Sequence, residues 1–210
     1  MLQVTDLQFG YDAPLVSGLN FTIEAGKIRL LHGPSGCGKS TLLAILSGTA
    51  DKILKWKGKI TLDGVEIGHL PAAQRGVGLM FQDPLLFPHM TVGDNLAFGL
   101  RGARSGRAER RQAVLDALHE CGLDDFAERD PASLSGGQKA RVALMRALLA
   151  APKMLLLDEA FSSLDPELRQ TFGKFVASQV AMRQIPALLV SHDAGDKSLT
   201  NGDIIRFPSL

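Results

Sequence analysis

The stretch GPSGCGKS, from Gly33 to Ser40, has the spacing G-x-x-x-x-G-K-[ST] that is typical of a phosphate-binding loop. Glycines there let backbone N–H groups point at phosphate oxygens, and a following helix adds the positive end of its dipole. We expect Lys39 to reach the terminal phosphates and the Ser40 hydroxyl to bind Mg²⁺. A glycine-rich turn without a ligand is the alternative. The predicted nucleotide contacts of this loop are Gly33, Pro34, Ser35, Gly36, Cys37, Gly38, Lys39, Ser40 and Thr41.

Polar side chains follow three further apolar segments that are predicted to be strands. Gln82 follows GVGLMF, Asp158 and Glu159 follow KMLLL, and His192 follows PALLVS. Ligands of open α/β sheets bind at the carboxyl ends of the strands. We therefore expect an amide, two carboxylates and an imidazole to meet the phosphate loop at one edge of a sheet.

Beside bound phosphates these side chains would have distinct roles. We expect Asp158 and Gln82 to lie at Mg²⁺, Glu159 to polarise an attacking water, and His192 to contact the terminal phosphate. The alternatives are a solvated carboxylate pair, a surface glutamine and a structural histidine. The only tyrosine, Tyr11, could stack on a base, as could the only tryptophan, although such residues more often fill core or surface.

A second glycine-rich stretch, LSGGQ, precedes the apolar segment KARVALMRALLA. Ser135 is expected near the N-cap of a helix, with Gly136 and Gly137 freeing N–H groups in its first turn. An ordinary capped helix is the alternative. If the stretch binds an anion, that anion is either a different ligand or a nucleotide held by another molecule.

Alternating strands and helices are predicted to position these groups. The segments KIRLLH, GVGLMF, KMLLL and PALLVS are predicted buried strands, whereas STLLAILSG, KARVALMRALLA and DPELRQTFGKFVASQVAMRQ are predicted helices. The first of these helices is expected to end at Gly48. This alternation favours an α/β fold with a mainly parallel sheet and helices on its faces.

The remaining segments predict two additions to that sheet. LQVTDLQF, LNFTIEAG and GKITLDGVEI indicate an N-terminal antiparallel β subdomain, with a hairpin at Asp63 and Gly64. Residues 83–138 indicate an inserted, mostly helical subdomain that includes a helix closed by Gly122. We therefore expect one domain, 1–210, in which 1–82 and 139–210 form the β/α core.

The composition disfavours several classes of protein. The chain has 210 residues, of which 45 % are hydrophobic, so one domain with a sizeable core is expected. Its net charge of +1 gives no basic field for nucleic acid or an anionic membrane. Cys37 and Cys121 lie far apart, which favours a reducing cytoplasm. Neither a signal peptide nor a membrane span is predicted, so any work at a membrane is expected to need a partner.

The motifs GPSGCGKST, FQD, LSGGQ, LLLDEA and SHD, in this order, resemble those of the ATP-binding subunit of an ABC transporter. The likeness covers nearly the whole chain. It implies a P-loop NTPase core of the RecA type, ATP and Mg²⁺ as ligands, and ATP hydrolysis as the activity. In that family two domains form a head-to-tail dimer, and the signature motif of one closes over the ATP of the other. The signature residues so implied at a partner's ATP are Ser135, Gly136, Gly137 and Gln138.

The resemblance also implies roles for residues outside the two glycine-rich stretches. Tyr11 matches the aromatic residue that stacks on adenine, and Gln82 matches the glutamine that senses both Mg²⁺ and the membrane subunit. Glu159 matches the catalytic base and His192 the switch histidine. Asp165, in the stretch SSLD, matches a residue that communicates across the dimer.

The run DPLLFPHMTVGDNLAFGL resembles importer ATPases of the thiamine, iron and polyamine kind, here without a C-terminal regulatory domain. This implies permease subunits and, indirectly, a solute-binding protein as partners, at the cytoplasmic face of the inner membrane. Two departures from the family pattern stand out. Ala160 replaces the usual proline, and the segment after His192 is short and interrupted by glycine. The second departure leaves open how the His192 loop is supported.

Two other functions compete with transport. A soluble ABC-type ATPase acting on DNA or ribosomes usually has two cassettes or a long coiled coil, and the near-neutral charge disfavours nucleic acid. A small-molecule kinase with a phosphate loop would leave LSGGQ without a role. The sequence therefore favours an ATPase that energises import of a small solute.

Overall fold

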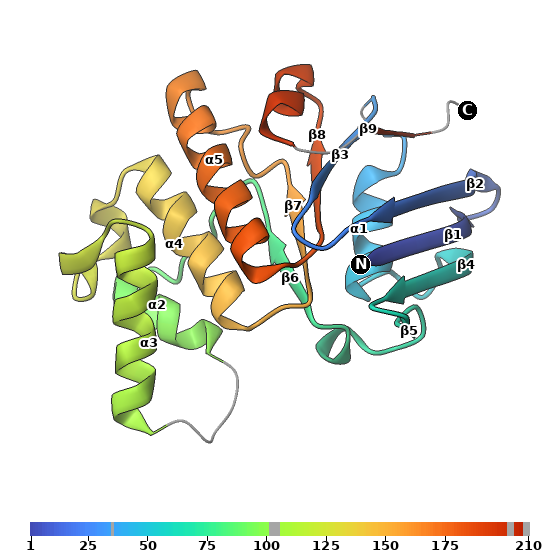
Figure 1. The fold of residues 1–210 in the computed structure, drawn as a ribbon. Helices are drawn as coiled ribbons and strands as arrows, with labels where there is room; N and C mark the ends of the chain where they lie inside the picture. Colours follow the sequence, from blue (N-terminus) through green and yellow to red (C-terminus); the bar gives the residue numbers. More distant parts are fainter. Residues whose placement is uncertain (35, 101–105, 201–203, 208–210) are drawn as a thin grey trace.

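The computed structural model describes residues 1–34, 36–100, 106–200 and 204–207, which form two sheets and several helices (Figure 1). The strands are β1 (Leu2–Gly10), β2 (Pro14–Ile23), β3 (Ile28–His32), β4 (Lys55–Leu62), β5 (Val65–Glu66), β6 (Val77–Met80), β7 (Met154–Asp158), β8 (Ala187–Ser191) and β9 (Ile204–Arg206). The α-helices are α1 (Lys39–Ser47), α2 (Val92–Gly99), α3 (Arg107–Glu120), α4 (Gly136–Leu149) and α5 (Pro166–Arg183). Short 3₁₀ helices are η1 (Ala72–Gln74), η2 (Asp124–Phe126), η3 (Pro131–Ser133) and η4 (Ala194–Leu199).

The larger sheet has the strand order β6-β7-β8-β3-β9, and each neighbouring pair is parallel. Its central strands consist almost entirely of buried apolar residues, because helices or the second sheet cover both faces. The four predicted strands are confirmed, and the edge strand β9 was not predicted. Since all these strands run the same way, their carboxyl ends share one edge of the sheet.

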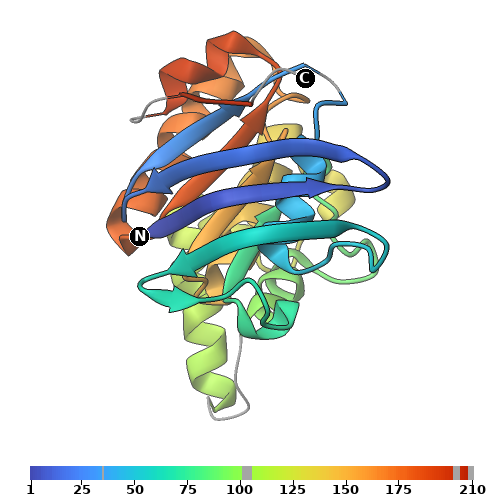
Figure 2. The same cartoon turned by 90° about the vertical axis from the view of Figure 1, so that its right-hand side faces the viewer.

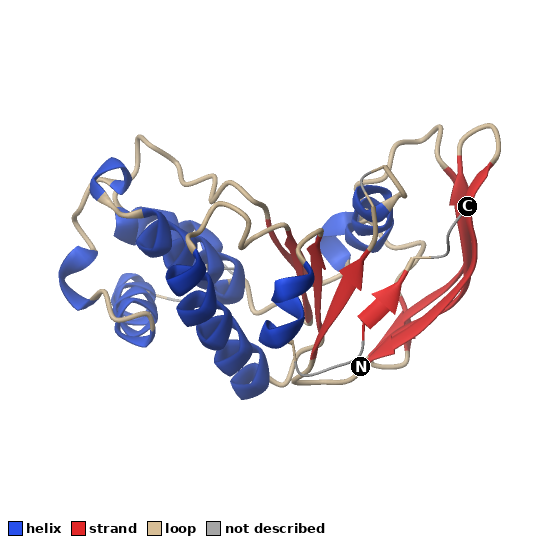
Figure 3. Cartoon of the chain, turned by 90° about the horizontal axis from the view of Figure 1, so that it is seen from above, coloured by secondary structure: helices blue, strands red, loops and turns tan. Residues whose placement is uncertain are grey.

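Helix α1 lies between the two sheets, as Figure 3 shows in the view from above. Its buried leucines pack in one cluster with Leu31 and Leu156 of the parallel sheet and with residues of β1, β2 and β4. The helix ends at Gly48, whose left-handed backbone lets its N–H donate to the carbonyls of Ala44 and Ile45. This end of the helix confirms the prediction made from the glycine.

The smaller sheet is antiparallel, with the order β2-β1-β4-β5, and faces the viewer in Figure 2. Asp63 and Gly64 join β4 to β5 and both have positive φ, 51° and 79°. Positive φ at both central residues is what a type I′ hairpin requires. The predicted hairpin and antiparallel subdomain are therefore present.

Helices α4 and α5 cover the other face of the parallel sheet, and α2 and α3 lie beyond them (Figure 1). The predicted helix closed by Gly122 is α3. Helix α2 was not predicted, because Gly93, Gly99 and neighbouring turn residues obscured its periodicity. Contacts with α4 stabilise it: a Cβ on Gly99 would lie 2.1 Å from the carbonyl oxygen of Arg146.

Candidate functional site

The phosphate loop connects β3 to α1, and its lysine already has partners within the loop. Lys39 is 8 % exposed, and its ammonium donates to the carbonyls of Gly33 and Pro34, both at 2.7 Å. Gly36 and Gly38 have φ of 79° and 102°, which strain other residues. The local backbone therefore requires these glycines whether or not a ligand is bound. Ser35 lies outside the described residues.

Gly38 also brings the loop against the antiparallel sheet. A Cβ at this position would lie 2.9 Å from Leu15 Cδ2 and 3.1 Å from Phe9 Cε2. Phe9 lines a cavity of about 250 Å³ between β1, the β1–β2 turn and β4. The cavity and the phosphate loop are thus neighbours that share the Phe9 ring.

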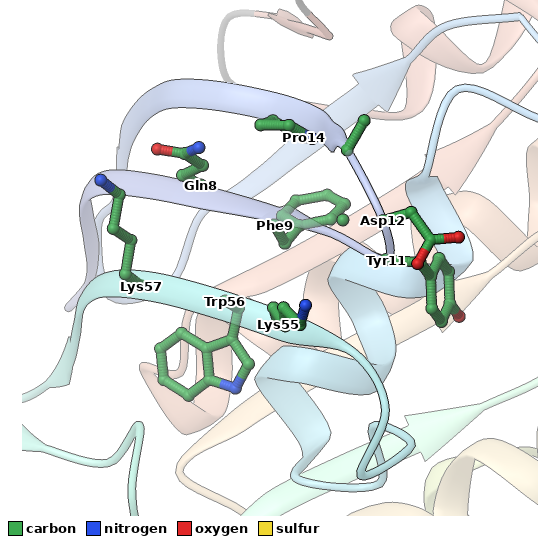
Figure 4. A pocket seen from close by; sticks show the side chains of 10 residues that line it. Gln8, Phe9, Tyr11, Asp12, Pro14, Lys55, Trp56 and Lys57 are labelled. Carbon is green, nitrogen blue, oxygen red and sulfur yellow. The ribbon is translucent and has the colours of Figure 1, made fainter.

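Tyr11 lies in that turn and lines the cavity together with Trp56 and Lys55 of β4 (Figure 4). The Tyr11 side chain is 48 % exposed. Trp56 already stacks on His69, with ring centroids 5.7 Å apart and an interplanar angle of 20°. Of the two aromatic residues considered for base stacking, Tyr11 is therefore the one with a more available ring.

Asp158 ends β7 and lies electrostatically close to the phosphate loop. Burial raises the pKa of its carboxyl most, and the neighbouring Glu159 raises it further, whereas Lys39 opposes both effects. The opposing effect of Lys39 means that the ammonium and this carboxylate lie near each other at the carboxyl end of β7.

Glu159 and His192 meet at the ends of β7 and β8. His192 Nδ1 lies 3.3 Å from Glu159 Oε1, and both side chains are accessible. Glu159 has φ of +50°, a conformation that costs a non-glycine residue energy and is often kept at functional sites. Its N–H donates to the Val190 carbonyl at 3.0 Å, so the neighbouring strand holds the strained residue in place.

The oxygen donors expected for Mg²⁺ come from three elements. Ser40 is the second residue of α1, Asp158 ends β7, and the exposed Gln82 follows β6. Within the described residues no cluster of three or more His, Cys, Asp or Glu side chains could bind a metal. The chemistry of this donor set fits Mg²⁺, which prefers oxygen ligands and binds through one or two carboxylates, with nucleotide phosphates and water completing its shell.

The signature stretch LSGGQ begins α4. Ser135 is the N-cap: its Oγ accepts from the Gln138 N–H at 3.3 Å, and the Gln138 side chain accepts from the Ser135 N–H at 2.9 Å. This capping box confirms the predicted helix start. Among the described residues Oγ acts only as an acceptor, so the Ser135 O–H can still donate.

Asp165 begins α5 as its N-cap. One of its oxygens, Oδ1, accepts from the N–H groups of Glu167 and Leu168 at 3.1 and 3.0 Å. Helix capping therefore occupies one oxygen of the residue to which the resemblance gave a role across the dimer. The structural role and that proposed role can coexist, because the carboxylate has a second oxygen.

Two arginines that hold parts of the site were not predicted. Arg75 donates to carbonyls of the last turn of α1, and Arg169 donates to the loop after Glu159 and to Asp193 after His192. No spacing motif marks either residue. The available signal for Arg169 was its place four residues after Asp165, in the first turns of the helix that follows the carboxylates.

No helix among the described residues is long and apolar enough to cross a membrane. The family model described as ABC transporter matches residues 16–162. The chain is 49 % identical over 185 residues to the uncharacterized ABC transporter ATP-binding protein YnjD of Escherichia coli (strain K12), and this match covers 88 % of this chain and 85 % of YnjD.

The chain also resembles importer ATPases. It is 41 % identical over 194 residues to the spermidine/putrescine import ATP-binding protein PotA of Pasteurella multocida (strain Pm70), covering 92 % of this chain and 51 % of PotA. The match to PotA of Salmonella typhimurium is 43 % over 193 residues, 91 % of this chain and 50 % of PotA. The chain thus spans about half the length of these PotA relatives.

Among solved structures, CbiO1 from Clostridium perfringens, part of the ABC transporter complex CbiONQ, superposes with a TM-score of 0.87 and 28 % identity, over 99 % of this chain and 86 % of that one. This superposition confirms the predicted α/β fold class. The match of the family model to most of the chain and the identity to YnjD show the family directly. The chain belongs to the ATP-binding proteins of ABC transporters and is an ATPase.

Proposed function

We propose that two copies of this chain bind two MgATP between them, and that hydrolysis drives a membrane permease to import a small solute. The observation that carries the proposal is the meeting of Glu159 and His192 at 3.3 Å, on the sheet edge that also bears the phosphate loop. A carboxylate there can polarise a water beside the terminal phosphate, and the imidazole can contact that phosphate. In this proposal Ser40, Asp158 and Gln82 hold Mg²⁺, which neutralises phosphate charge when bound.

The positions of the two glycine-rich stretches support a head-to-tail dimer. The phosphate loop begins α1 on one face of the parallel sheet, whereas Ser135 begins α4 on the other (Figure 1). A nucleotide on the phosphate loop is therefore closed by the Ser135 hydroxyl and the glycine N–H groups of a second copy. The free O–H of the Ser135 cap is the donor that a phosphate oxygen would take.

The adenine is proposed to stack on Tyr11, since the cavity there adjoins the phosphate loop through Phe9. Import is supported by the PotA relatives, which are named as spermidine/putrescine import ATP-binding proteins. The proposed partners are permease subunits and, through them, a solute-binding protein. The chain is proposed to lie at the cytoplasmic face of the inner membrane as a peripheral subunit. The relatives are transporter proteins, and they do not favour an ATPase that acts on DNA or ribosomes or a small-molecule kinase.

The test replaces Glu159 with Gln, which removes the base and keeps the shape of the side chain. Phosphate release by Glu159→Gln is expected to fall about 10²–10⁴-fold. The variant is expected to bind MgATP and to elute as a dimer in size-exclusion chromatography with MgATP. Glu24→Gln is the control, because Glu24 is exposed and precedes β3 at the opposite edge of the sheet.

Two results would refute separate parts of the proposal. Hydrolysis by Glu159→Gln at the rate of Glu24→Gln would exclude Glu159 as the base. A Glu159→Gln chain that binds MgATP and remains monomeric at every concentration would exclude the closed dimer.

A further inference from the structure

Arg169 on α5 joins two loops of the site through one guanidinium. Its Nε donates to the Phe161 carbonyl at 3.2 Å, and Nη2 donates to the Ser162 carbonyl at 3.5 Å. Nη1 donates to Asp193 Oδ2 and lies 3.6 Å from Asp196 Oδ1. The side chain is 21 % exposed, so these contacts lie largely within the fold.

Each of these contacts leads to a side chain of the hydrolytic pair. The Glu159 carbonyl accepts from both the N–H and the hydroxyl of Ser162, at 3.0 and 2.8 Å, so the backbone that Arg169 holds is tied to Glu159. On the other side, Asp193 directly follows His192. The guanidinium therefore fixes the loop that carries the carboxylate against the loop that carries the imidazole.

The buried carboxylate of Asp196 requires a positively charged side chain at the position of Arg169. Its side chain is 3 % exposed, and its Oδ1 has no hydrogen-bond partner among the described residues. A buried carboxylate without a cation is strongly disfavoured, and Arg169 lies near enough to provide the charge. Asp193 divides its oxygens: Oδ1 accepts from the Gly195 N–H at 2.8 Å, and Oδ2 faces Arg169.

Apolar packing holds the same loop against α5. A Cβ on Gly173 would lie 2.6 Å from Leu199 Cδ2, so the end of η4 is seated directly on α5, one turn after Arg169. A cavity of about 400 Å³ opens beside the guanidinium and is lined by Leu164, Pro166, Asp193 and Asp196 among others. Apolar packing thus anchors the C-terminal end of η4, whereas Arg169 supports its N-terminal end, next to His192.

We propose that Arg169 is a positioning residue that sets the relative placement of Glu159 and His192 by clamping the loops that carry them. The inference rests on the proposed function, because it gives Arg169 a role only through those two side chains. It accounts for the support of the His192 loop in a chain whose segment after this histidine is short and interrupted by glycine.

The test compares Arg169→Lys with Arg183→Lys. Lysine keeps the charge near Asp196 but cannot reach two carbonyls and two carboxylates with one fork. Arg183 is a matched control on the same helix: it is 25 % exposed and also contacts a carboxylate and an amide, those of Glu120 and Gln179.

We expect kcat of Arg169→Lys to fall about tenfold while KM for ATP stays within about twofold. Both constants should stay within about twofold in Arg183→Lys. In ATP-free protein, the imidazole NMR signals of His192 should shift in Arg169→Lys and not in Arg183→Lys. His69 and His89, which lie outside both loops and are not next to Glu120 or Ser191, should keep their signals in both variants.

Asp193→Asn gives a second, milder break of the clamp. Its side-chain oxygen can still accept from Gly195, while its amide group faces Arg169 and cannot accept a hydrogen bond. As for Arg169→Lys, kcat is expected to fall, KM for ATP to stay nearly unchanged and the His192 signals to shift. If Arg169→Lys does not fold, this variant tests the role of Arg169 in its place.

The inference is wrong if kcat and the His192 signals match those of the control. It is also wrong if KM and thermal stability change in step with kcat, since Arg169 would then act only on folding. A wild-type chain that does not hydrolyse ATP under any condition overturns the proposed function itself, whereas an active wild type with unaffected variants overturns only the role of Arg169.

Discussion

Replacement of Arg75 by Met should destabilise the chain through the helix that begins with the phosphate loop. Arg75 is 6 % exposed and donates to carbonyls at both sides of a junction: Ile45 and Leu46 in the last turn of α1, and Gly68 and Leu70 before η1. Burial lowers the pKa of its guanidinium, which stays charged at neutral pH. Methionine fills similar space and donates no hydrogen bond.

The magnitude follows from the carbonyls that would lose their donor. Ile45 still has the Gly48 N–H at 3.3 Å, and the bond from Arg75 to Leu46 is a long one of 3.2 Å. The main losses therefore fall on Gly68 and Leu70, whose bonds to Arg75 are 2.6 and 2.7 Å. At about 1–3 kcal/mol for each buried unsatisfied group, two of them cost about 2–6 kcal/mol. The lost cation at the C-terminus of α1 adds about 0.3–1 kcal/mol. We expect a loss of about 3–5 kcal/mol.

Urea unfolding followed by circular dichroism measures this free energy, and thermal unfolding gives an independent value. For a chain of this size the expected loss lowers the melting temperature by roughly 6–20 °C. Arg111→Met, which changes an exposed arginine of α3, should stay within about 0.5 kcal/mol of wild type. A loss below about 1 kcal/mol in Arg75→Met would refute the reasoning, since water would then replace the guanidinium at little cost.

Two further predictions concern single side chains. Cys121 is 2 % exposed and burial raises its pKa to about 11, so at pH 8 a thiol reagent should label only the partly exposed Cys37 in the native chain and both cysteines after unfolding. Labelling of both thiols in the native chain would contradict the burial of Cys121. The thiol has a lower pKa in the unfolded chain, so its contribution to stability is complete below about pH 9 and is lost as the pH rises toward 11. Ser135→Ala should lose about 1 kcal/mol of stability with the cap and should bind ATP but hydrolyse it slowly, as calorimetry and phosphate release can measure. The control, Thr91→Ala, removes the equivalent cap of α2 and should lose similar stability while keeping its activity. Equal activity in the two variants would exclude a role of Ser135 beyond capping.

The predictable part of the site follows from local patterns joined by one rule of topology. The phosphate loop is a continuous stretch, and its glycines are needed by the local backbone. Glu159 and His192 lie 33 residues apart, yet their meeting was predictable because each follows a buried strand of a parallel sheet. The sequence could not show that β7 and β8 are neighbours, and this adjacency is what brings the two side chains to 3.3 Å.

The unpredicted part depends on contacts between elements that are distant in the chain. Helix α2 contains two glycines and is stabilised by packing on α4, so its local pattern was weak. Strand β9 has three residues and exists because β3 offers it a free edge. Arg75 and Arg169 bind carbonyls and carboxylates through long side chains, and no periodicity or motif records such partners.

Hydrogen bonds within one chain hold several groups of the proposed site. Lys39 donates to two carbonyls of its own loop, and an ammonium has three donors, so one remains for a phosphate while the loop keeps its shape. The Val190 carbonyl and the hydroxyl of Ser162 hold Glu159 at its strained φ. In the proposed site these bonds would hold the ammonium and the carboxylate in fixed positions, and such preorganisation is what lowers a barrier. In the proposed dimer, the Ser135 hydroxyl of the second copy would supply the remaining donor, so association of two chains would complete the hydrolytic site.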